Sequence, residues 1–293
     1  MMRIGLQLPS FSWPGGPAEI APRLIEIAQT AEAAGFASLW VMDHFFQLPD
    51  WGSLDSPMLE SYTTLGYLAA ATKKIRLGAM VTGVIYRFPG VLVKTASTLD
   101  VLSGGRSYLG LGAGWYRREA VGLGIPFPPL AERFARLEET LQIVRQMWAG
   151  EVKPYTGNYY QLAEPHNAPQ PLAQPHPSIL IGGNGEQKTL RLAAQYGDAC
   201  NLLVLEPEEI RSKLAMLKQH CAEIGRDYAE IEKTCLEEVN LAPDAMSVKD
   251  IIALCRARAD LGIEHVIVNM PDPHTLRPLE IFGREIIPEI AAF

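Results

Sequence analysis

The chain has 293 residues, of which 48% are apolar, and a formal net charge of −7. This length allows a substantial buried core, arranged either as two domains or as one barrel of roughly 250 residues with insertions. The acidic balance excludes a basic nucleic-acid or membrane face, and no apolar run reaches the length of a membrane span, so we expect a cytoplasmic protein with a small-molecule substrate.

Short strand-like runs alternate with helical periodicity along the chain. Apolar residues recur at helical spacing from Ile20 to Ala31 and stop at Gly35, and Pro89 is placed to open a later helix. The predicted strands are Ile4–Leu8, Ser38–Met42, Ile75–Thr82, Arg106–Leu111, Ile179–Ile181, Ala199–Val204, Cys235–Leu241 and His265–Asn269. The predicted helices include Tyr62–Thr72, Pro89–Leu102, Phe134–Trp148, Ile210–Cys221, Val248–Cys255 and Leu276–Ile287.

About eight strand–helix units in alternation predict parallel strands joined by crossover helices. The economical closed arrangement is a (β/α)8 TIM barrel, with a doubly wound open sheet as the alternative. Two stretches interrupt the alternation, at about 115–130 and 150–177, and Tyr155–Tyr159 in the second is typical of a hairpin tip. We expect both to lie over the C-terminal mouth of a single barrel domain that spans residues 1–293.

Candidate chemistry follows the second predicted strand. Active sites of such barrels gather at the C-terminal ends of the strands, and this strand ends in Asp43 and His44. A histidine there can exchange a proton near neutral pH, and Asp43 could orient it or accept a hydrogen bond from a cofactor ring. The structural alternative is an ordinary loop start in which the histidine is bonded to the backbone.

The third predicted strand ends in a glycine-flanked segment, Gly78–Gly83. Glycine on both sides of Met80-Val81 favours a bulge or a bend, and Thr82 would then place a hydroxyl at the mouth. The alternative is an ordinary apolar strand end.

Two glycine clusters each follow a strand and precede a helix. Glycine lets backbone N–H groups approach a ligand, and a helix N-terminus favours an anion. Gly110–Trp115 lacks the dinucleotide fingerprint, because Trp115 stands where the last glycine belongs, and it suits a surface for a flat ring. Gly182–Gly185 precedes a helix expected to start near Glu186, which makes it a candidate phosphate cradle. The alternative for both glycine clusters is an ordinary tight turn. If both clusters bind a ligand, they indicate a single large anionic cofactor that contacts the two segments.

The cysteines and histidines show no metal-site pattern. We expect the cysteines to be reduced, packed thiols because they are widely spaced and form no C-x-x-C pair; they are Cys200, Cys221, Cys235 and Cys255. The sequence therefore predicts no metal centre.

Five blocks of the chain resemble, in order, those of the bacterial luciferase-like flavin and deazaflavin oxidoreductases. The blocks are Ser38–His44, Ile75–Thr82, Pro89–Arg106, Gly110–Trp115 and Ile181–Gly185. The Thr-Leu-Asp-x-Leu-Ser-x-Gly-Arg run that ends at Arg106 is quite specific to that family. The resemblance covers essentially the whole chain and is strongest to the branch that depends on coenzyme F420.

The resemblance implies a TIM barrel with insertions over its mouth and a non-proline cis peptide at Met80-Val81. It also implies that Asp43 contacts the deazaflavin ring, that His44 lies near the hydride-carrying carbon, and that the amides of Gly182–Gly185 hold the cofactor phosphate. With His44 and Asp43 as catalytic candidates, the expected cofactor-binding residues are Asp43, Met80, Val81, Thr82, Gly112, Ala113, Gly114, Trp115, Gly182, Gly183, Asn184 and Gly185.

The predicted function is hydride transfer between F420 and a small organic substrate. Sugar-phosphate dehydrogenases in the family carry a glutamate at the position of Trp115, so this residue favours a more apolar substrate. The alternatives are an FMN-dependent luciferase-like monooxygenase or reductase and a non-catalytic flavin- or deazaflavin-binding protein. The subunit number is open, with a homodimer as the arrangement to test.

Overall fold

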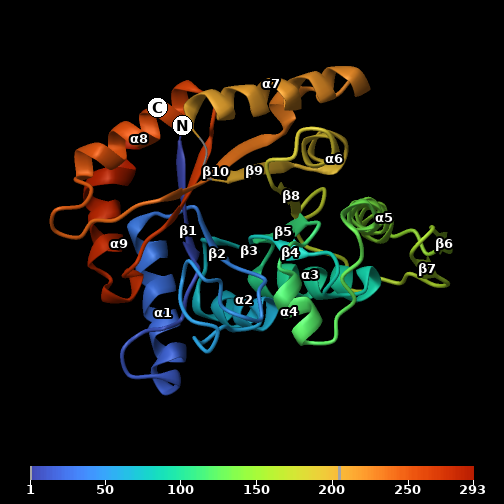
Figure 1. Ribbon diagram of the computed structural model, residues 1–293, viewed down its shortest axis with the longest axis horizontal. Coiled ribbons are helices and arrows are strands. Elements are labelled where there is room, and N and C mark those ends of the chain that lie inside the picture. Colours follow the sequence, from blue (N-terminus) through green and yellow to red (C-terminus); the bar gives the residue numbers. More distant parts are fainter. Residues whose placement is uncertain (1, 204–205) are drawn as a thin grey trace.

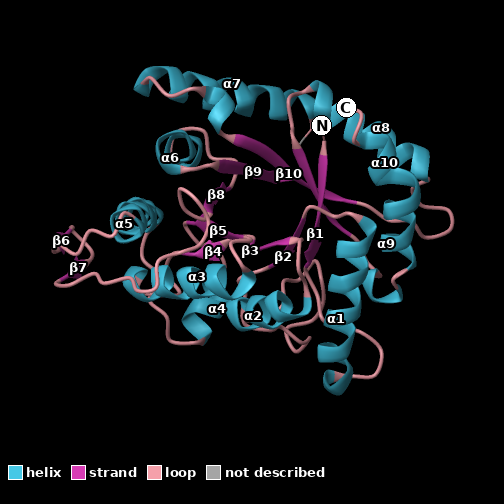
Figure 2. Cartoon of the chain, turned by 180° about the vertical axis from the view of Figure 1, so that it is seen from behind, coloured by secondary structure: helices cyan, strands magenta, loops and turns pink. Residues whose placement is uncertain are grey.

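In the computed structural model, which describes residues 2–203 and 206–293, a parallel barrel is surrounded by helices (Figure 1, Figure 2). Neighbouring barrel strands follow the order β3-β2-β1-β11-β10-β9-β8-β5, and a direct β3–β5 pairing closes the ring. The barrel strands are β1 (Arg3–Leu8), β2 (Ser38–Val41), β3 (Arg76–Ala79), β5 (Ser107–Gly112), β8 (Ser178–Gly182), β9 (Ala199–Leu203), β10 (Glu232–Glu238) and β11 (His265–Asn269). This closed barrel confirms the predicted TIM fold and rules out the open sheet.

The helices lie outside the barrel and agree closely with the periodicity of the sequence. They are α1 (Pro17–Ala34), α2 (Ser61–Ala71), α3 (Pro89–Ser103), α4 (Arg117–Gly122), α5 (Leu130–Trp148), α6 (Thr189–Tyr196), α7 (Pro207–Ile224), α8 (Val248–Asp260), α9 (Arg277–Ile281) and α10 (Ile287–Ile290), with short 3-10 turns at Tyr228–Glu230 and Pro273–Thr275. Pro89 opens α3 as predicted, and Gly35 ends α1 with a left-handed φ of 92°.

The seventh predicted strand has different bounds in the structure. The seventh was predicted at Cys235–Leu241, but β10 begins earlier, at Glu232. The charged residues at its start look like a loop in the sequence, yet Glu232 pairs with His265 at 2.7 Å. The sixth predicted strand ends at Val204, which lies outside the described residues, and β9 is described to Leu203.

The last predicted helix, Leu276–Ile287, is interrupted in the structure. Leu276 has a φ of 65°, and a π-helical turn at Phe282–Ile286 separates α9 from α10. Gly283 in that turn packs tightly on α1, where an added Cβ would stand 2.8 Å from the Cα of Ala34. The wider turn therefore coincides with a close helix contact that helical periodicity does not reveal.

Inward-facing side chains fill the barrel and locate its mouth. The buried inner cluster comprises Trp40, Met80, Tyr108, Leu180, Ala199 and Ile267. In the register of β10 and β11, Leu236 pairs with Ile267 and Glu238 pairs with Asn269. Asn269 therefore faces the barrel interior like Ile267, two residues nearer the carboxyl ends of the strands. Asn201 and Gly182, which pair across β8 and β9, occupy the equivalent step above Ala199 and Leu180.

Two buried carboxylates anchor the second insertion to the helices. Asp100 accepts hydrogen bonds from the amides of Leu172 and Ala173 at 2.7 and 2.9 Å. Glu139 on α5 accepts from the amides of Asn158 and Tyr160 at 2.7 and 3.0 Å. These bonds hold the predicted hairpin, formed by β6 (Tyr155–Thr156) and β7 (Gln161–Leu162), beside α5 (Figure 1).

The four cysteines are buried and free, as predicted. Burial raises the pKa of Cys200 to about 12, so its thiol is neutral. Among the described helices, none has the length and apolarity to cross a membrane. Within the described residues, no three His, Cys, Asp or Glu side chains form a group that could hold a metal ion.

Candidate active site

The two glycine clusters meet at the break in the third strand. The Met80-Val81 peptide is cis, as the resemblance implies, and β4 (Thr82–Gly83) resumes pairing with β5 beyond it. An added Cβ on Gly112 would stand 2.8 Å from Cγ2 of Val81, and one on Gly182 would stand 2.8 Å from its Cγ1. The clusters therefore make room for the Val81 side chain at the mouth of the barrel.

His44 has a buried carboxylate partner that the sequence analysis missed. Nδ1 of His44 lies 2.6 Å from Oε1 of Glu119, although the residues are 75 positions apart. Glu119 is completely buried, and its Oε2 accepts from the amides of Phe45 and Phe46 at 2.7 and 3.2 Å. Because α4 of the first insertion carries Glu119, the only available signal was an acidic residue within a stretch predicted to cover the mouth.

Tyr86 completes the surroundings of Glu119. Its hydroxyl donates to Oε1 of the carboxylate. Burial raises the pKa of Glu119, but hydrogen bonds from His44, Tyr86 and the Phe45 amide outweigh burial and leave the pKa lowered. Burial and the neighbouring Glu119 raise the pKa of Tyr86. At neutral pH, an ionised Glu119 thus accepts from a neutral phenol.

Asp43 is bound to Arg87 rather than to His44. Its carboxylate accepts from Nη1 and Nη2 of Arg87 at 2.7 and 2.9 Å, from Oγ of Ser61 at 2.6 Å and from the Gly83 amide at 3.2 Å. The bidentate pair ties the end of β2 to the end of the third strand. Two roles were expected for Asp43. His44 is oriented by Glu119 instead of Asp43, and contact between Asp43 and a cofactor ring stays a prediction.

Thr82 lies outside the mouth, contrary to the prediction that its hydroxyl lies there. It is completely buried, and its hydroxyl lies 2.8 Å from that of Tyr62. Met80 belongs to the inner cluster and Val81 packs against it, so two successive residues face inward. The bulge therefore reverses the alternation, and Thr82 pairs with the outward-facing Leu111. Its hydroxyl therefore supports the barrel wall from outside.

The first glycine cluster places an exposed indole beside His44. Gly112 ends β5, Ala113 is half-buried, and Gly114 turns the chain with a φ of 76°. Trp115 is 61% exposed and meets the imidazole edge-on, with ring centroids 5.6 Å apart. This open indole is available to cover a ligand next to His44.

The second glycine cluster is partly occupied by its own hydrogen bonds. The Gly183 amide donates to the Asn201 carbonyl at 3.1 Å, and Asn184 pairs with the backbone of Leu203 through Oδ1 and Nδ2 at 2.9 and 3.2 Å. The helix predicted near Glu186 begins instead at Thr189, because residues 186–188 form a turn. The position predicted to bind an anion is therefore displaced toward the first turn of α6.

Two asparagines on the inner wall have polar atoms without partners. Nδ2 of Asn201 and Oδ1 of Asn269 are buried and form no hydrogen bond with the part of the chain that the structure describes. Oδ1 of Asn201 accepts from the Thr234 hydroxyl at 2.7 Å, which leaves its Nδ2 as a donor. Buried polar groups are normally paired, so this donor and this acceptor point to a ligand. Their only sequence signal was an amide in an otherwise apolar strand.

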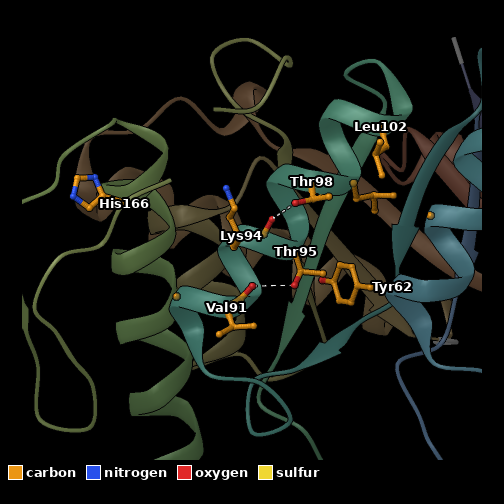
Figure 3. Close-up of a pocket in the computed structure, with 10 residues that line it drawn as sticks. Tyr62, Val91, Lys94, Thr95, Thr98, Leu102 and His166 are labelled. Atoms are coloured by element: carbon orange, nitrogen blue, oxygen red, sulfur yellow. Dashed lines mark hydrogen bonds between the residues drawn. The ribbon is translucent and has the colours of Figure 1, made fainter. Parts of the chain in front are cut away.

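A separate groove lies on the outside of the barrel (Figure 3). It has a volume of about 550 Å³ and is lined by α2 and α3, with His166 from the second insertion at its edge. The hydroxyls of Thr95 and Thr98 bond to the carbonyls of their own helix, at Val91 and Lys94. The groove offers no titratable pair comparable to His44 and Glu119, so we exclude it from the candidate active site.

The closed barrel and the histidine–carboxylate pair at its mouth define a TIM-barrel enzyme. A profile of the luciferase-like monooxygenase family matches residues 2–268, and the chain belongs to this family of oxidoreductases. An F420-dependent glucose-6-phosphate dehydrogenase from Kineococcus radiotolerans is 31% identical over 275 residues, which cover 85% of this chain and 79% of that protein.

Solved structures show the same fold at lower identity. An F420-dependent secondary alcohol dehydrogenase in complex with an F420-acetone adduct superposes with a TM-score of 0.84 at 20% identity and covers 99% of both chains. A riboflavin lyase with modified FMN and riboflavin gives a TM-score of 0.83 at 13% identity, over 100% of this chain and 92% of the other. At these identities the similarity establishes the fold alone.

Proposed function

We propose that this protein transfers a hydride between coenzyme F420 and a small organic substrate. The observation that carries the proposal is the unpartnered pair on the inner wall, Nδ2 of Asn201 and Oδ1 of Asn269. A deazaflavin has carbonyl and N–H groups on one edge of a flat ring, which complement one donor and one acceptor. The F420-dependent relative supports the choice of cofactor.

The residues at the mouth fit such a ring and its phosphate. Val81 and the glycines around it would form the surface behind the ring, and Trp115 would border it near His44. The backbone from Asn184 to the first turn of α6 would hold the phosphate through N–H groups. When bound, F420 supplies two-electron hydride chemistry.

The chain itself supplies a site for proton exchange at His44. His44 can exchange a proton with the substrate or stabilise charge that develops on it. Trp115 covers the adjacent surface with an indole where the sugar-phosphate dehydrogenases of the family carry a glutamate, which favours a substrate less polar than a sugar phosphate. Exclusion of water there would strengthen the interaction between His44 and the substrate.

A ligand titration tests the cofactor. The purified chain should bind F420 with a micromolar Kd or better, and at a hundredfold excess over Kd the ligand should add about 2.7 kcal/mol to the free energy of unfolding. Thermal unfolding is measured with F420, FMN and NAD(P)H in parallel. A melting temperature that FMN raises and F420 leaves unchanged would favour the FMN-dependent alternative, and no response to either would contradict the proposal.

A further inference from the structure

The hydrogen bonds around Glu119 specify which nitrogen of His44 carries a proton. An ionised carboxylate only accepts hydrogen bonds. The other partners of Glu119 are donors: two backbone amides and the Tyr86 hydroxyl. Nδ1 of His44, 2.6 Å from Oε1, must therefore donate as well, which leaves Nε2 of the neutral imidazole with a free lone pair.

The imidazole is held in this orientation by packing. Trp115 and Tyr116 meet the ring edge-on, with centroids 5.6 and 5.9 Å away and interplanar angles of 76° and 75°. The His44 side chain is 13% exposed, and within the described part of the chain Nε2 has no hydrogen-bond partner. Nε2 is thus the nitrogen that remains for a substrate.

We propose that Glu119 is a positioning residue that keeps the proton of neutral His44 on Nδ1, so that Nε2 accepts the proton of a substrate hydroxyl. This inference rests on the proposed function and assigns the substrate to an alcohol–carbonyl pair. The hydride leaves the carbinol carbon with its electron pair and reduces the oxidised deazaflavin. The O–H bond breaks, its proton goes to Nε2, and the imidazolium later releases it to water; the reverse reaction returns both.

The first experiment observes the tautomer in the full chain without cofactor. Nitrogen-15 NMR of the labelled protein at neutral pH should show the proton of His44 on Nδ1. In Glu119→Gln, the amide oxygen should accept from the Phe45 and Phe46 amides, so its NH2 group faces His44 and the proton moves to Nε2. The matched control is Glu139→Gln, which removes another buried carboxylate that accepts backbone amides and should leave the tautomer unchanged.

The second experiment measures turnover with F420 and a secondary alcohol. Glu119→Gln should lower kcat by about 10²–10⁴-fold, as loss of an orienting carboxylate does in other histidine-dependent enzymes, with KM changed less than about threefold. Glu119→Asp should recover part of kcat, because it keeps the charge. Glu139→Gln should stay within about threefold of the parent enzyme.

An Nε2–H tautomer in the parent chain would overturn the assignment, as would a Glu119→Gln variant that keeps both the Nδ1–H tautomer and full kcat. If Glu119→Gln does not fold, the tautomer of the parent chain still tests the assignment. Glu119→Asp then replaces Glu119→Gln in the kinetic test, and full kcat in a variant that has lost the Nδ1–H tautomer would contradict the proposal. Failure to bind F420 would remove the proposed function but leave the tautomer result intact, so the two failures are distinguishable.

Discussion

Side chains at the mouth of this barrel depend on partners from other loops. Glu119 orients His44 from the first insertion, and Arg87 holds Asp43 from the loop after the third strand. Each pair is buried or half-buried, so its hydrogen bonds are little weakened by competition with water. The chemistry proposed for His44 therefore depends on a small network rather than on one residue.

Replacing His44 tests that chemistry directly. His44→Ala should slow turnover by about 10²–10⁴-fold, because general acid–base assistance is lost, while the affinity for F420 changes far less. Steady-state kinetics and a cofactor titration separate the two effects. His166→Ala, at the exposed outer groove, is the matched histidine control and should leave both unchanged. Equal turnover by His44→Ala and the parent enzyme would remove His44 from the mechanism.

Glycine at position 110 has a packing role that substitution can expose. An added Cβ would stand 2.0 Å from the Ala79 carbonyl oxygen, so Gly110→Ala must displace backbone and should cost about 1–3 kcal/mol of unfolding free energy. Gly66→Ala, inside α2 with no atom within 4 Å of the new Cβ, should instead add about 0.5–1 kcal/mol. Urea unfolding measures both. Equal stability of the two variants would contradict this account of the bulge.

At the scale of elements, the site forms where the bulge in the third strand meets the ends of β5 and β8. The bulge between β3 and β4 turns both Met80 and Val81 inward, and the glycine ends of β5 and β8 leave the space that Val81 occupies. The loop that follows β8 is then fixed to β9 through Asn184 and Leu203. A change in any one of these loops should alter the shape of the common surface.

The loop after β8 provides a test of phosphate binding. Gly183 has a φ of 125°, which a valine rarely adopts, so Gly183→Val should rearrange the loop and weaken F420 binding at least about tenfold, or roughly 1.4 kcal/mol. A deazaflavin fragment without phosphate should lose much less affinity in the same titration. Gly104→Val, at a left-handed glycine after α3, controls for general strain. If the affinities for F420 and for the fragment fall equally, Gly183 shapes the fold rather than the phosphate site.

At the scale of the whole molecule, a buried charged network closes the opposite end of the barrel. Glu232 joins β1, β5 and β11, because its carboxylate meets His265 at 2.7 Å, Tyr108 at 2.9 Å and Arg3 at 3.0 Å. Burial raises the pKa of Glu232, but these three partners outweigh burial and lower the pKa to about 2. The network therefore links the stability of the closed barrel to pH.

The sign of that linkage follows from the lowered pKa of Glu232. Its contribution, on the order of 3 kcal/mol, is present above the ordinary value near 4.5 and is lost as the pH falls from about 4.5 to about 2. Urea unfolding between pH 2 and pH 7 should show this loss in the parent chain. The Glu232→Gln variant should have a lower free energy of unfolding at neutral pH, and this free energy should change less with pH across the acid range. An unchanged acid slope in the variant would contradict the assignment.

The subunit number belongs to the same scale and stays a prediction. Sedimentation equilibrium of the purified chain would measure it and would test whether the chain forms a homodimer. A mass near 32.2 kDa, that of one chain, would exclude a homodimer.

Local patterns were sufficient for the barrel and for part of the site. Alternating strand and helix periods indicate parallel crossovers, and the position of His44 at the end of a predicted strand marks it as a candidate site residue. The cis peptide at Met80-Val81 follows from the resemblance of a short block. These features depend on backbone periodicity and on residues next to one another, which a sequence records directly.

Only the tertiary structure decided the partners of those residues. Glu119 meets His44 across 75 positions, and the bulge turns Thr82 outward. Among the described residues, Nδ2 of Asn201 and Oδ1 of Asn269 face the interior without a hydrogen-bond partner. Hydrogen-bond partners depend on which loops the closed barrel brings together, and a single extra inward residue reverses the alternation beyond it. Periodicity along the chain was therefore enough to predict the barrel and the position of its mouth, whereas long-range packing set which groups meet there.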